Sequence, residues 1–328
     1  MIELSLDNSV RSLLKRGIAQ LREADIPSFT LAAELLLLHV LGRNRTWLYA
    51  HPEEIIADAD GRRFFDLIAR RATGEPTQYL TGKQEFWGLE LEITQDILIP
   101  RPETEHVIEV ALDRIALHEL RAGRPRKSTG AGLQIADIGT GSGCIAIALA
   151  KELTAANFVA TDISPAALAV AKRNATRHAV ADRIDFREAN LLSPVGAQQA
   201  APQPGKIANN ASPAVHESQI TSHKSRLFDL IASNPPYIGR RESPSLPREV
   251  RDHEPASALF GGEEGYELYA DLIAQAAQHL KPGGLLVLEL GHNSLPAVQP
   301  LLDAKVWTNV GVTNDLAAIP RVLAAERL

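Results

Sequence analysis

The chain has 328 residues, of which 45% are hydrophobic, and a formal net charge of −6. This length exceeds one average domain, so we expect a large α/β unit and a smaller accessory domain. The negative charge argues against a protein that coats nucleic acid, and the single cysteine, Cys144, excludes an intramolecular disulfide and a cysteine metal cluster. No apolar signal region is visible, and the apolar run at residues 31–41 is too short to span a bilayer. We therefore expect a cytoplasmic protein.

The first part of the chain has the periodicity of helices, and the sequence predicts a small helical domain over residues 1–75. Its first apolar stripe consists of Val10, Leu13, Leu14, Ile18 and Leu21. A linker over residues 76–105 follows. Within it, short extended runs at residues 85–87 and 89–93 flank Gly88, which predicts a β-hairpin between the two domains.

Strands and helices alternate after residue 130, and this alternation predicts a doubly wound, mainly parallel sheet. The expected strands cover residues 133–138, 157–161, 183–186, 228–233 and 284–290, and the expected helices cover residues 104–118, 144–153, 165–178 and 266–280. We assign residues 106–328 to this domain. The stretch at residues 195–226 is rich in Ala, Gln, Pro, Asn and Ser and lacks an apolar period, so we expect a disordered insertion there.

A glycine-rich turn connects the first expected strand of this domain to its helix. Gly139, Gly141 and Gly143 alternate with Thr140 and Ser142. Glycines at these positions let the backbone approach a ligand closely and turn tightly into the helix. The dinucleotide fingerprint spaces its glycines as GxGxxG, which this turn lacks. The turn therefore favours an adenosyl amino acid over a dinucleotide, and we expect its five residues to bind that cofactor.

Asp162 ends the next expected strand, where a carboxylate can accept hydrogen bonds from both hydroxyls of a ribose. The alternative is that Asp162 caps the following helix, although Ser164 is better placed for that role. We expect Ile163 to line the same site. Asn190 and Leu191 follow the third strand, at the position of an adenine ring.

The most informative stretch is Asn234, Pro235, Pro236 and Tyr237, directly after the expected strand at residues 228–233. The prolines fix φ and remove N–H donors, so their carbonyls and the Asn234 side chain can face outward as acceptors. Tyr237 offers a flat ring. These residues suit a planar –NH2 group, although Asn-Pro is also ordinary turn chemistry.

Several further motifs carry a family resemblance that covers the chain outside the insertion. They are QYLTG at residues 78–82, EFWG at 85–88, LIPRPETE at 98–105, DIGTGSG at 137–143, NPPY at 234–237, EVRDHEP at 249–255 and LFGGEEG at 259–265. With them the chain resembles the class I S-adenosylmethionine methyltransferases, and more narrowly the release factor glutamine methyltransferases, which are protein-(glutamine-N5) methyltransferases. The resemblance implies a Rossmann-like sheet of seven strands, a small N-terminal helical domain and a β-hairpin linker.

The resemblance also implies the chemistry. S-adenosylmethionine would donate the methyl group and become S-adenosylhomocysteine. The acceptor would be the side-chain amide nitrogen of the glutamine in the Gly-Gly-Gln motif of class 1 peptide chain release factors, and the helical domain would recognise that substrate protein. This chain departs from the family in having Asn190 in place of an acidic residue and in its long insertion.

The residues then suggest a mechanism in which positioning dominates. Asn234 and the Pro235 carbonyl would accept the two amide N–H bonds, Asn234 would also contact the cofactor, and Tyr237 would pack against the glutamine amide. Together with Pro236, Arg101 and Glu103 would shape the substrate entrance. We expect no metal, since the sulfonium is already an activated leaving group.

Other classes of protein remain as alternatives. An N6-adenine or N2-guanine nucleic-acid methyltransferase could hold the amine of a base with the same residues 234–237, which we call the NPPY clamp. The aromatic content of 5% and the negative charge disfavour this class. We expect no stable binding to nucleic acid and none to membranes. A non-catalytic binding module is disfavoured by the intact motifs, and a nicotinamide dehydrogenase by the glycine spacing. The sequence leaves open the preferred release factor, the oligomeric state, the role of the insertion and the final proton acceptor.

Overall fold

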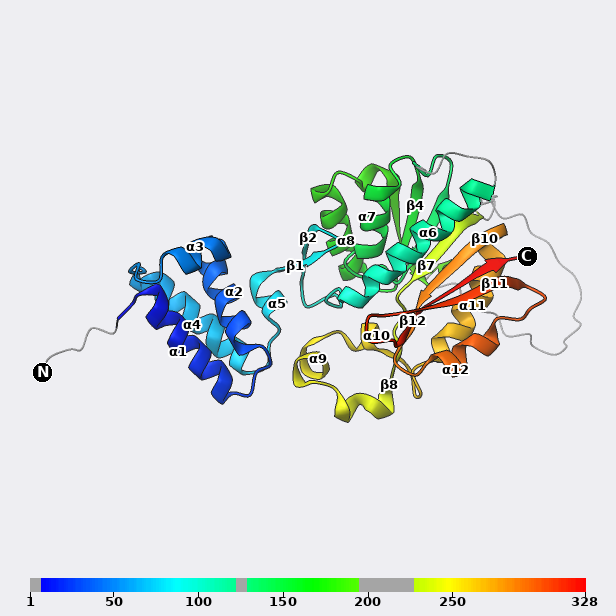
Figure 1. Cartoon of the computed structure of the whole chain (residues 1–328). Coiled ribbons are helices and arrows are strands. Elements are labelled where there is room, and N and C mark those ends of the chain that lie inside the picture. The colour runs from blue at the N-terminus through cyan, green and yellow to red at the C-terminus, as the bar shows by residue number, and fades with distance from the viewer. Residues whose placement is uncertain (1–6, 122–128, 195–226) are drawn as a thin grey trace, which may run out of the picture.

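The computed structural model describes residues 7–121, 129–194 and 227–328. The insertion predicted at residues 195–226 lies outside these ranges. Figure 1 shows a helical N-terminal part joined through a small hairpin to a larger part built around a sheet. Among the described residues, no helix has both the length and the apolar character needed to cross a membrane.

The N-terminal part is built from five helices packed around their own apolar core. These are α1 (Val10–Glu23), α2 (Phe29–Leu41), α3 (Arg45–Ala50), α4 (Asp58–Ala72) and α5 (Thr77–Thr81). Leu13, Leu21, Leu36 and Phe64 are fully buried in this core. The Ser9 side chain accepts a hydrogen bond from the Ser12 amide and so caps the start of α1. The apolar stripe seen in the sequence is therefore the inner face of a helix bundle.

A β-hairpin connects the bundle to the sheet domain, as the sequence predicted. Strands β1 (Lys83–Phe86) and β2 (Leu89–Glu92) pair in antiparallel fashion, and the turn between them places Trp87 and Gly88 at positive φ. The fully buried Asn174 of helix α8 (Pro165–Arg177) connects this hairpin to the sheet domain. Its Nδ2 donates to the carbonyls of Glu92 and Ser142, both at 3.0 Å, and its Oδ1 accepts from the Glu92 amide at 2.7 Å.

The large domain contains a mixed sheet of seven strands with a two-residue strand, β6 (Ser193–Pro194), at one edge. The seven are β3 (Gln134–Ile138), β4 (Asn157–Asp162), β5 (Ile184–Asn190), β7 (Phe228–Ser233), β10 (Leu280–Glu289), β11 (Trp307–Asn314) and β12 (Pro320–Arg327). Their spatial order is β11-β12-β10-β7-β3-β4-β5. Strands β10, β7, β3, β4 and β5 are parallel to one another. Strand β12 runs antiparallel to β10, and β11 runs antiparallel to β12. The predicted Rossmann-like, doubly wound sheet is confirmed.

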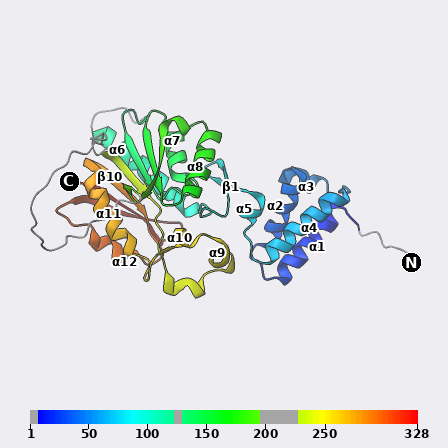
Figure 2. The ribbon, with the colours of Figure 1, turned by 180° about the vertical axis from the view of Figure 1, so that it is seen from behind.

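Alternate residues of each strand enter two different cores, because successive side chains of a strand point to opposite faces. Ile135 and Leu230 pack under α6 (Glu105–Arg121), α7 (Cys144–Glu152) and α8 (Pro165–Arg177). Ala136 and Ile231 pack under α11 (Glu267–His279) and α12 (Leu295–Val298). Figures 1 and 2 show these two helical layers on opposite faces of the sheet.

The segment after β7 lies between the sheet and the helical bundle. It contains β8 (Ile238–Gly239), η3 (Arg240–Ser245), α9 (Arg248–His253), α10 (Ala256–Leu259) and β9 (Phe260–Gly262). An ion pair of 2.5 Å joins the buried Arg71 of α4 to Glu249 of α9. Figure 1 shows α9 on the side of the large domain nearest the bundle. The two parts are thus connected by the hairpin and by a partly buried charge pair.

The boundaries differ from the sequence expectations at several places. The third strand, expected at residues 183–186, extends to Asn190, so Asn190 ends the strand instead of following it. The helix expected at residue 104 begins at Glu105, and Thr104 ends a short 3-10 turn, η1 (Pro102–Thr104). Strands β11 and β12 had no individual sequence prediction.

We expect Asn174→Ala to lower the free energy of unfolding by about 3 kcal/mol, because it leaves one buried N–H and two carbonyls without their side-chain partners. Urea unfolding measures the change. Asn157→Ala, at an exposed strand end, is the matched control and should change stability by less than about 0.5 kcal/mol. Equal effects for the two variants would contradict a docking role for Asn174.

Candidate active site

Polar residues converge where the central parallel strands end. Asp162 is the last residue of β4, Asn190 is the last of β5, and Asn234 directly follows β7. Because the carboxyl ends of parallel strands meet at one edge, these residues share one region. Ser233 closes the junction of β7 and β3 by donating from Oγ to the Ile138 carbonyl at 2.7 Å. Residues far apart in the sequence therefore form one candidate site.

A cavity of about 260 Å³ opens at this edge of the sheet. Eight of the residues that the sequence assigned to the site line it: Gly139, Gly141, Asp162, Ile163, Asn190, Leu191, Asn234 and Pro236. The rest of the lining includes apolar groups from Ile97, Leu98 and Phe260, together with Asp96 and Ser257. The cavity thus combines apolar walls with a few convergent polar groups, which is typical of a small-molecule site.

The three glycines of the turn have different environments. Gly139 and Gly141 adopt φ values of 71° and 53°, and a Cβ added to either would meet no atom within 4 Å. Both therefore border open space. Gly143 has a φ of 84°, and a Cβ there would lie 2.8 Å from Cδ1 of Ile147 and 3.2 Å from Cβ of Ala171. Gly143 accordingly permits the close packing of α7 against α8.

Thr140 and Ser142 are buried behind the turn and do not line the cavity. The Thr140 hydroxyl donates to Oδ2 of the fully buried Asp137 at 2.6 Å, and the Ala146 amide donates to the same oxygen at 3.1 Å. Burial raises the pKa of Asp137 to about 6 despite these bonds. The bonds to Asp137 hold the turn in shape, while a ligand in the cavity would meet the backbone of the turn.

Asp162 faces the cavity with both carboxylate oxygens already accepting backbone hydrogen bonds. Gly141 donates to Oδ2 and Ser164 donates to Oδ1, each at 2.9 Å. Burial raises the pKa of Asp162 against the opposing effect of these bonds. Each oxygen keeps a second lone pair for a ligand hydroxyl. The helix cap considered as an alternative is provided by Ser164, whose Oγ accepts from the Ala167 amide at 3.1 Å.

The Asn234 amide has a defined orientation. Its Nδ2 donates to Oγ1 of Thr104 at 3.0 Å, so its acceptor, Oδ1, lies on the opposite side of the amide. Pro235 is buried beside it, and Pro236 borders the cavity. Tyr237 does not line the cavity. Its hydroxyl is directed toward Glu289 and donates to Oε1 at 3.2 Å. The structure thus places Asn234 and Pro236 at the cavity and Tyr237 behind them.

The glycines of the LFGGEEG segment allow it to pack directly on the NPPY backbone. A Cβ at Gly261 would overlap the Pro236 carbonyl, and one at Gly265 would overlap the Tyr237 carbonyl. Strand β8 pairs in parallel with β9 over this contact. The sequence showed this segment only as a family motif, and its structural role is to brace the four-residue clamp.

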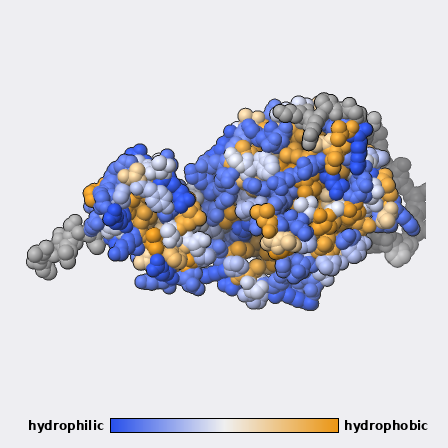
Figure 3. Space-filling view, in the orientation of Figure 1, coloured by the Kyte–Doolittle hydropathy of each residue, from blue (hydrophilic) through white to orange (hydrophobic). Residues whose placement is uncertain are grey.

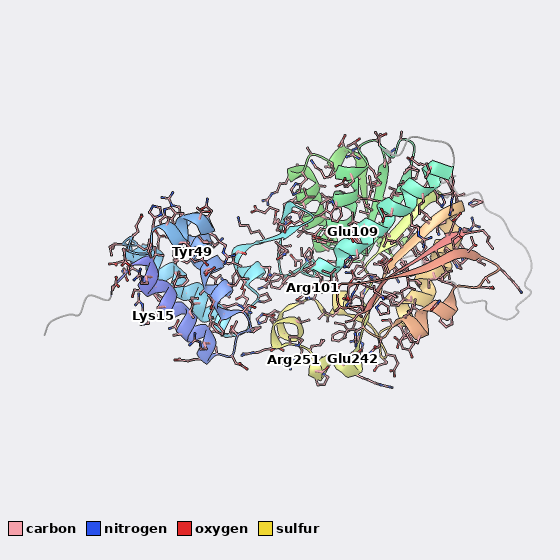
Figure 4. The ribbon with its side chains drawn as sticks, viewed as in Figure 1. Lys15, Tyr49, Arg101, Glu109, Glu242 and Arg251 are labelled. Carbon is pink, nitrogen blue, oxygen red and sulfur yellow. The ribbon has the colours of Figure 1, made fainter. Side chains whose placement is uncertain are left out.

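Arg101 and Glu103 are not among the residues that line the cavity. Arg101 forms an ion pair of 2.5 Å with Glu254, whose side chain is 1% exposed. Burial raises the pKa of Glu254, and Arg101 opposes that shift. Glu103 is exposed. Figure 4 shows Arg101 on the side of the sheet domain that faces the α9 segment, where Arg251 is labelled.

Thr104 and Glu289 are site residues that the sequence analysis missed. Thr104 was visible inside the RPETE motif, but nothing in its spacing connected it with Asn234, which is 130 positions away. Glu289 ends β10 and is fully buried. An acidic residue that interrupts an otherwise apolar strand end was the available signal. Among the described residues, no group of three or more His, Cys, Asp or Glu side chains could hold a metal ion.

The doubly wound sheet with this cavity at its carboxyl edge is the architecture that the sequence motifs predicted for an α/β methyltransferase. Residues 12–82 match the family described as PrmC N-terminal domain, and residues 116–209 match the family described as Ribosomal protein L11 methyltransferase (PrmA). The chain belongs to the release factor glutamine methyltransferase family, as the sequence motifs indicated.

Two relatives with that name illustrate the membership. The protein from Koribacter versatilis is 38% identical, over 97% of this chain and 99% of its own length. The protein from Nitratidesulfovibrio vulgaris is 37% identical, over 97% of this chain and 95% of its own. Among solved structures, a ribosomal protein L11 methylase from Lactobacillus delbrueckii subsp. bulgaricus is 21% identical with a TM-score of 0.42, over 69% of this chain and 80% of that one.

We expect Asp162→Ala to weaken the binding of S-adenosylmethionine on the order of 100-fold, because it removes a carboxylate that would accept ribose hydroxyls and that also anchors the Gly141 amide. Isothermal titration calorimetry measures the affinity, and thermal unfolding checks the fold. Asp185→Ala, at an exposed position on the neighbouring strand β5, is the control and should bind as the wild type does. Unchanged affinity for Asp162→Ala would refute the ribose assignment.

Proposed function

We propose that this enzyme transfers the methyl group of S-adenosylmethionine to the side-chain amide nitrogen, N5, of a glutamine in a peptide chain release factor. The acceptor would be the glutamine of the Gly-Gly-Gln motif in class 1 release factors. The observation that carries this proposal is the position of Asn234, with its amide held by Thr104 at the rim of the cavity. Membership of the release factor glutamine methyltransferase family supports the identity of the acceptor.

The residues around the cavity fit S-adenosylmethionine. The open space beside Gly139 and Gly141 would accept the methionine portion, Asp162 would bind the ribose, and Asn190 and Leu191 would flank the adenine. Ile163 lies beside Asp162 along the same wall. The cofactor supplies a methyl group on a sulfonium, which is an activated leaving group. S-adenosylhomocysteine would be the product.

The NPPY residues would position the glutamine amide for transfer. Asn234 Oδ1 and the Pro235 carbonyl would each accept one N–H of the substrate –NH2 group, and the Tyr237 ring would pack against the amide. The lone pair of a carboxamide nitrogen is delocalised, so correct orientation is the main contribution available to the protein. Both acceptors also stabilise the positive charge that develops on the nitrogen. Neither is a strong base, and Glu254 is already paired with Arg101.

We propose that residues 1–75 form a domain that recognises the substrate protein. Residues 76–105 would link it to the catalytic domain at residues 106–328. Within this linker, Arg101 and Glu103 would shape the substrate entrance. Large apolar side chains remain exposed on the bundle: Leu31, Leu35, Tyr49 and Ile55. A groove of about 680 Å³ runs from α2 to the hairpin and includes Leu35 and Gln84. Figure 3 shows hydrophobic residues among polar ones on the visible face of the helical part. An apolar groove with a polar border suits a protein partner.

A methylation assay with labelled S-adenosylmethionine tests the function directly. We expect label on a class 1 release factor and none on its Gln→Ala variant in the Gly-Gly-Gln motif. DNA and RNA are included as substrates, because the clamp could hold the exocyclic amine of a nucleobase. Label on nucleic acid alone would overturn the proposal in favour of a nucleic-acid methyltransferase.

We expect Asn234→Ala to reduce kcat at least about 1,000-fold, since it removes one of the two acceptors that orient the nucleophile. The affinity for S-adenosylmethionine, measured by calorimetry, should stay within a few-fold of the wild type. Asn157→Ala is again the control and should leave both quantities unchanged. A parallel loss of cofactor binding in Asn234→Ala would instead make cofactor binding the main role of Asn234.

A further inference from the structure

A line of buried polar side chains extends behind Asn234, away from the cavity. Asn234 Nδ2 donates to Thr104 Oγ1 at 3.0 Å, and Thr104 is itself 1% exposed. The Thr104 hydroxyl faces the carboxyl group of Glu289 and favours its ionised form, as the Tyr237 hydroxyl does. These four side chains come from η1, the end of β7 and the end of β10, and they meet inside the protein.

Glu289 has an unused acceptor in this line. Its Oε1 accepts from the Tyr237 hydroxyl at 3.2 Å, whereas its buried Oε2 has no hydrogen-bond partner. Leaving a buried carboxylate oxygen without a donor is costly. Thr104 carries a hydroxyl that lowers the pKa of Glu289, and a shift of either side chain into hydrogen-bonding geometry would satisfy Oε2.

The direction of these hydrogen bonds follows from the chemistry of the carboxylate. An ionised carboxylate only accepts, so in a hydrogen bond between Thr104 and Glu289 the proton comes from Thr104. Thr104 then presents only lone pairs to Asn234, and these accept a proton from Nδ2. Nδ2 is thereby fixed toward Thr104, and Oδ1 is fixed on the side of the amide that faces the site. The orientation of a terminal amide depends on its hydrogen-bonding partners in this way.

We propose that Glu289, acting through Thr104, is a positioning residue that keeps Oδ1 of Asn234 turned toward the substrate amide. This inference rests on the proposed function for the identity of the substrate. The orientation of Asn234 does not depend on that identity. Tyr237 belongs to the same device, because its hydroxyl holds the other oxygen of Glu289.

Protonation of Glu289 would remove the directional constraint. A neutral carboxyl group can donate to Thr104, and Thr104 can then donate to Oδ1 of Asn234, which turns Nδ2 toward the substrate. Burial raises the pKa of Glu289 to about 7. Since the ionised form holds the productive orientation, kcat should fall as the pH falls through this value.

Other titratable or charged groups also act on Glu289 or lie in contact with it: Glu103 from η1, Arg321 from β12 with its partner Asp315, Tyr269 from α11 and Cys144 from α7.

Kinetics of the full-length enzyme on a release factor test the proposal first. Thr104→Val, which removes the hydroxyl and keeps the shape, should lower kcat about 10-fold with little change in KM for the cofactor. Thr104→Ser should restore most of the loss. The control Thr176→Val removes a hydroxyl that bonds within helix α8, and it should behave as the wild type does. Full kcat in Thr104→Val would overturn the proposal.

The pH profile gives a readout that a purely structural role would not move. The wild type should lose kcat below pH about 7. Glu289→Gln cannot ionise, so it should show a flat profile over the same range. An acidic limb that persists unchanged in Glu289→Gln would assign the titration to another group and overturn the proposal.

Nuclear magnetic resonance of the 15N-labelled protein separates this inference from the proposed function, because it needs no substrate. The side-chain amide resonances of Asn234, assigned by their loss in Asn234→Ser, should shift with pH in the wild type and stay fixed in Glu289→Gln. A titrating amide in an enzyme that does not methylate release factors would support the positioning device and refute the proposed function. Methylation together with an Asn234 amide that does not titrate would support the proposed function and refute the device.

Discussion

The parallel pairing of β7 with β3 is the constraint on which the geometry of the rest of the site depends. Four central strands run parallel, so their carboxyl ends meet at one edge, and Ser233 ties β7 to β3 there through the Ile138 carbonyl. Each strand delivers one element of the site where it ends: the glycine turn, Asp162, Asn190 and Asn234. The geometry of the cavity is therefore set by strand register, and the polar residues gain their mutual positions without a dedicated scaffold.

The second constraint is that the backbone must lie close to a ligand or to another backbone segment, and glycine allows both kinds of contact. At Gly139 and Gly141 the absent side chain leaves space for a ligand, whereas at Gly261 and Gly265 it makes room for the carbonyls of the NPPY residues. A side chain at Gly139 or Gly141 would occupy space for a ligand, and one at Gly261 or Gly265 would overlap those carbonyls. The consequence is a clamp whose backbone is fixed from both sides, by two prolines within it and by the β8–β9 pairing beside it.

The sequence predicted the parts of this protein that depend on local pattern. The alternation of strands and helices identified the sheet domain, and Asp162, Asn234 and the glycine turn were placed at strand ends by short-range signals. Thr104 and Glu289 could not be found in this way, since their partners are 130 and 52 positions distant. The roles of Thr140 and Ser142 were equally hidden, because spacing does not reveal which side of a turn faces a ligand. Strands β11 and β12 lie beyond the last clear βα repeat, where periodicity was weak.

The two acceptors of the proposed clamp differ in what holds them. Pro235 has its φ fixed by its own ring and its ψ restricted by Pro236, so its carbonyl needs no further support. The Asn234 amide rotates about a terminal torsion with two nearly equivalent orientations, only one of which presents oxygen to a substrate. A hydroxyl alone cannot choose between these orientations, because it can donate or accept. A carboxylate behind the hydroxyl removes the choice, which gives a physical reason for a buried acidic residue at the end of β10.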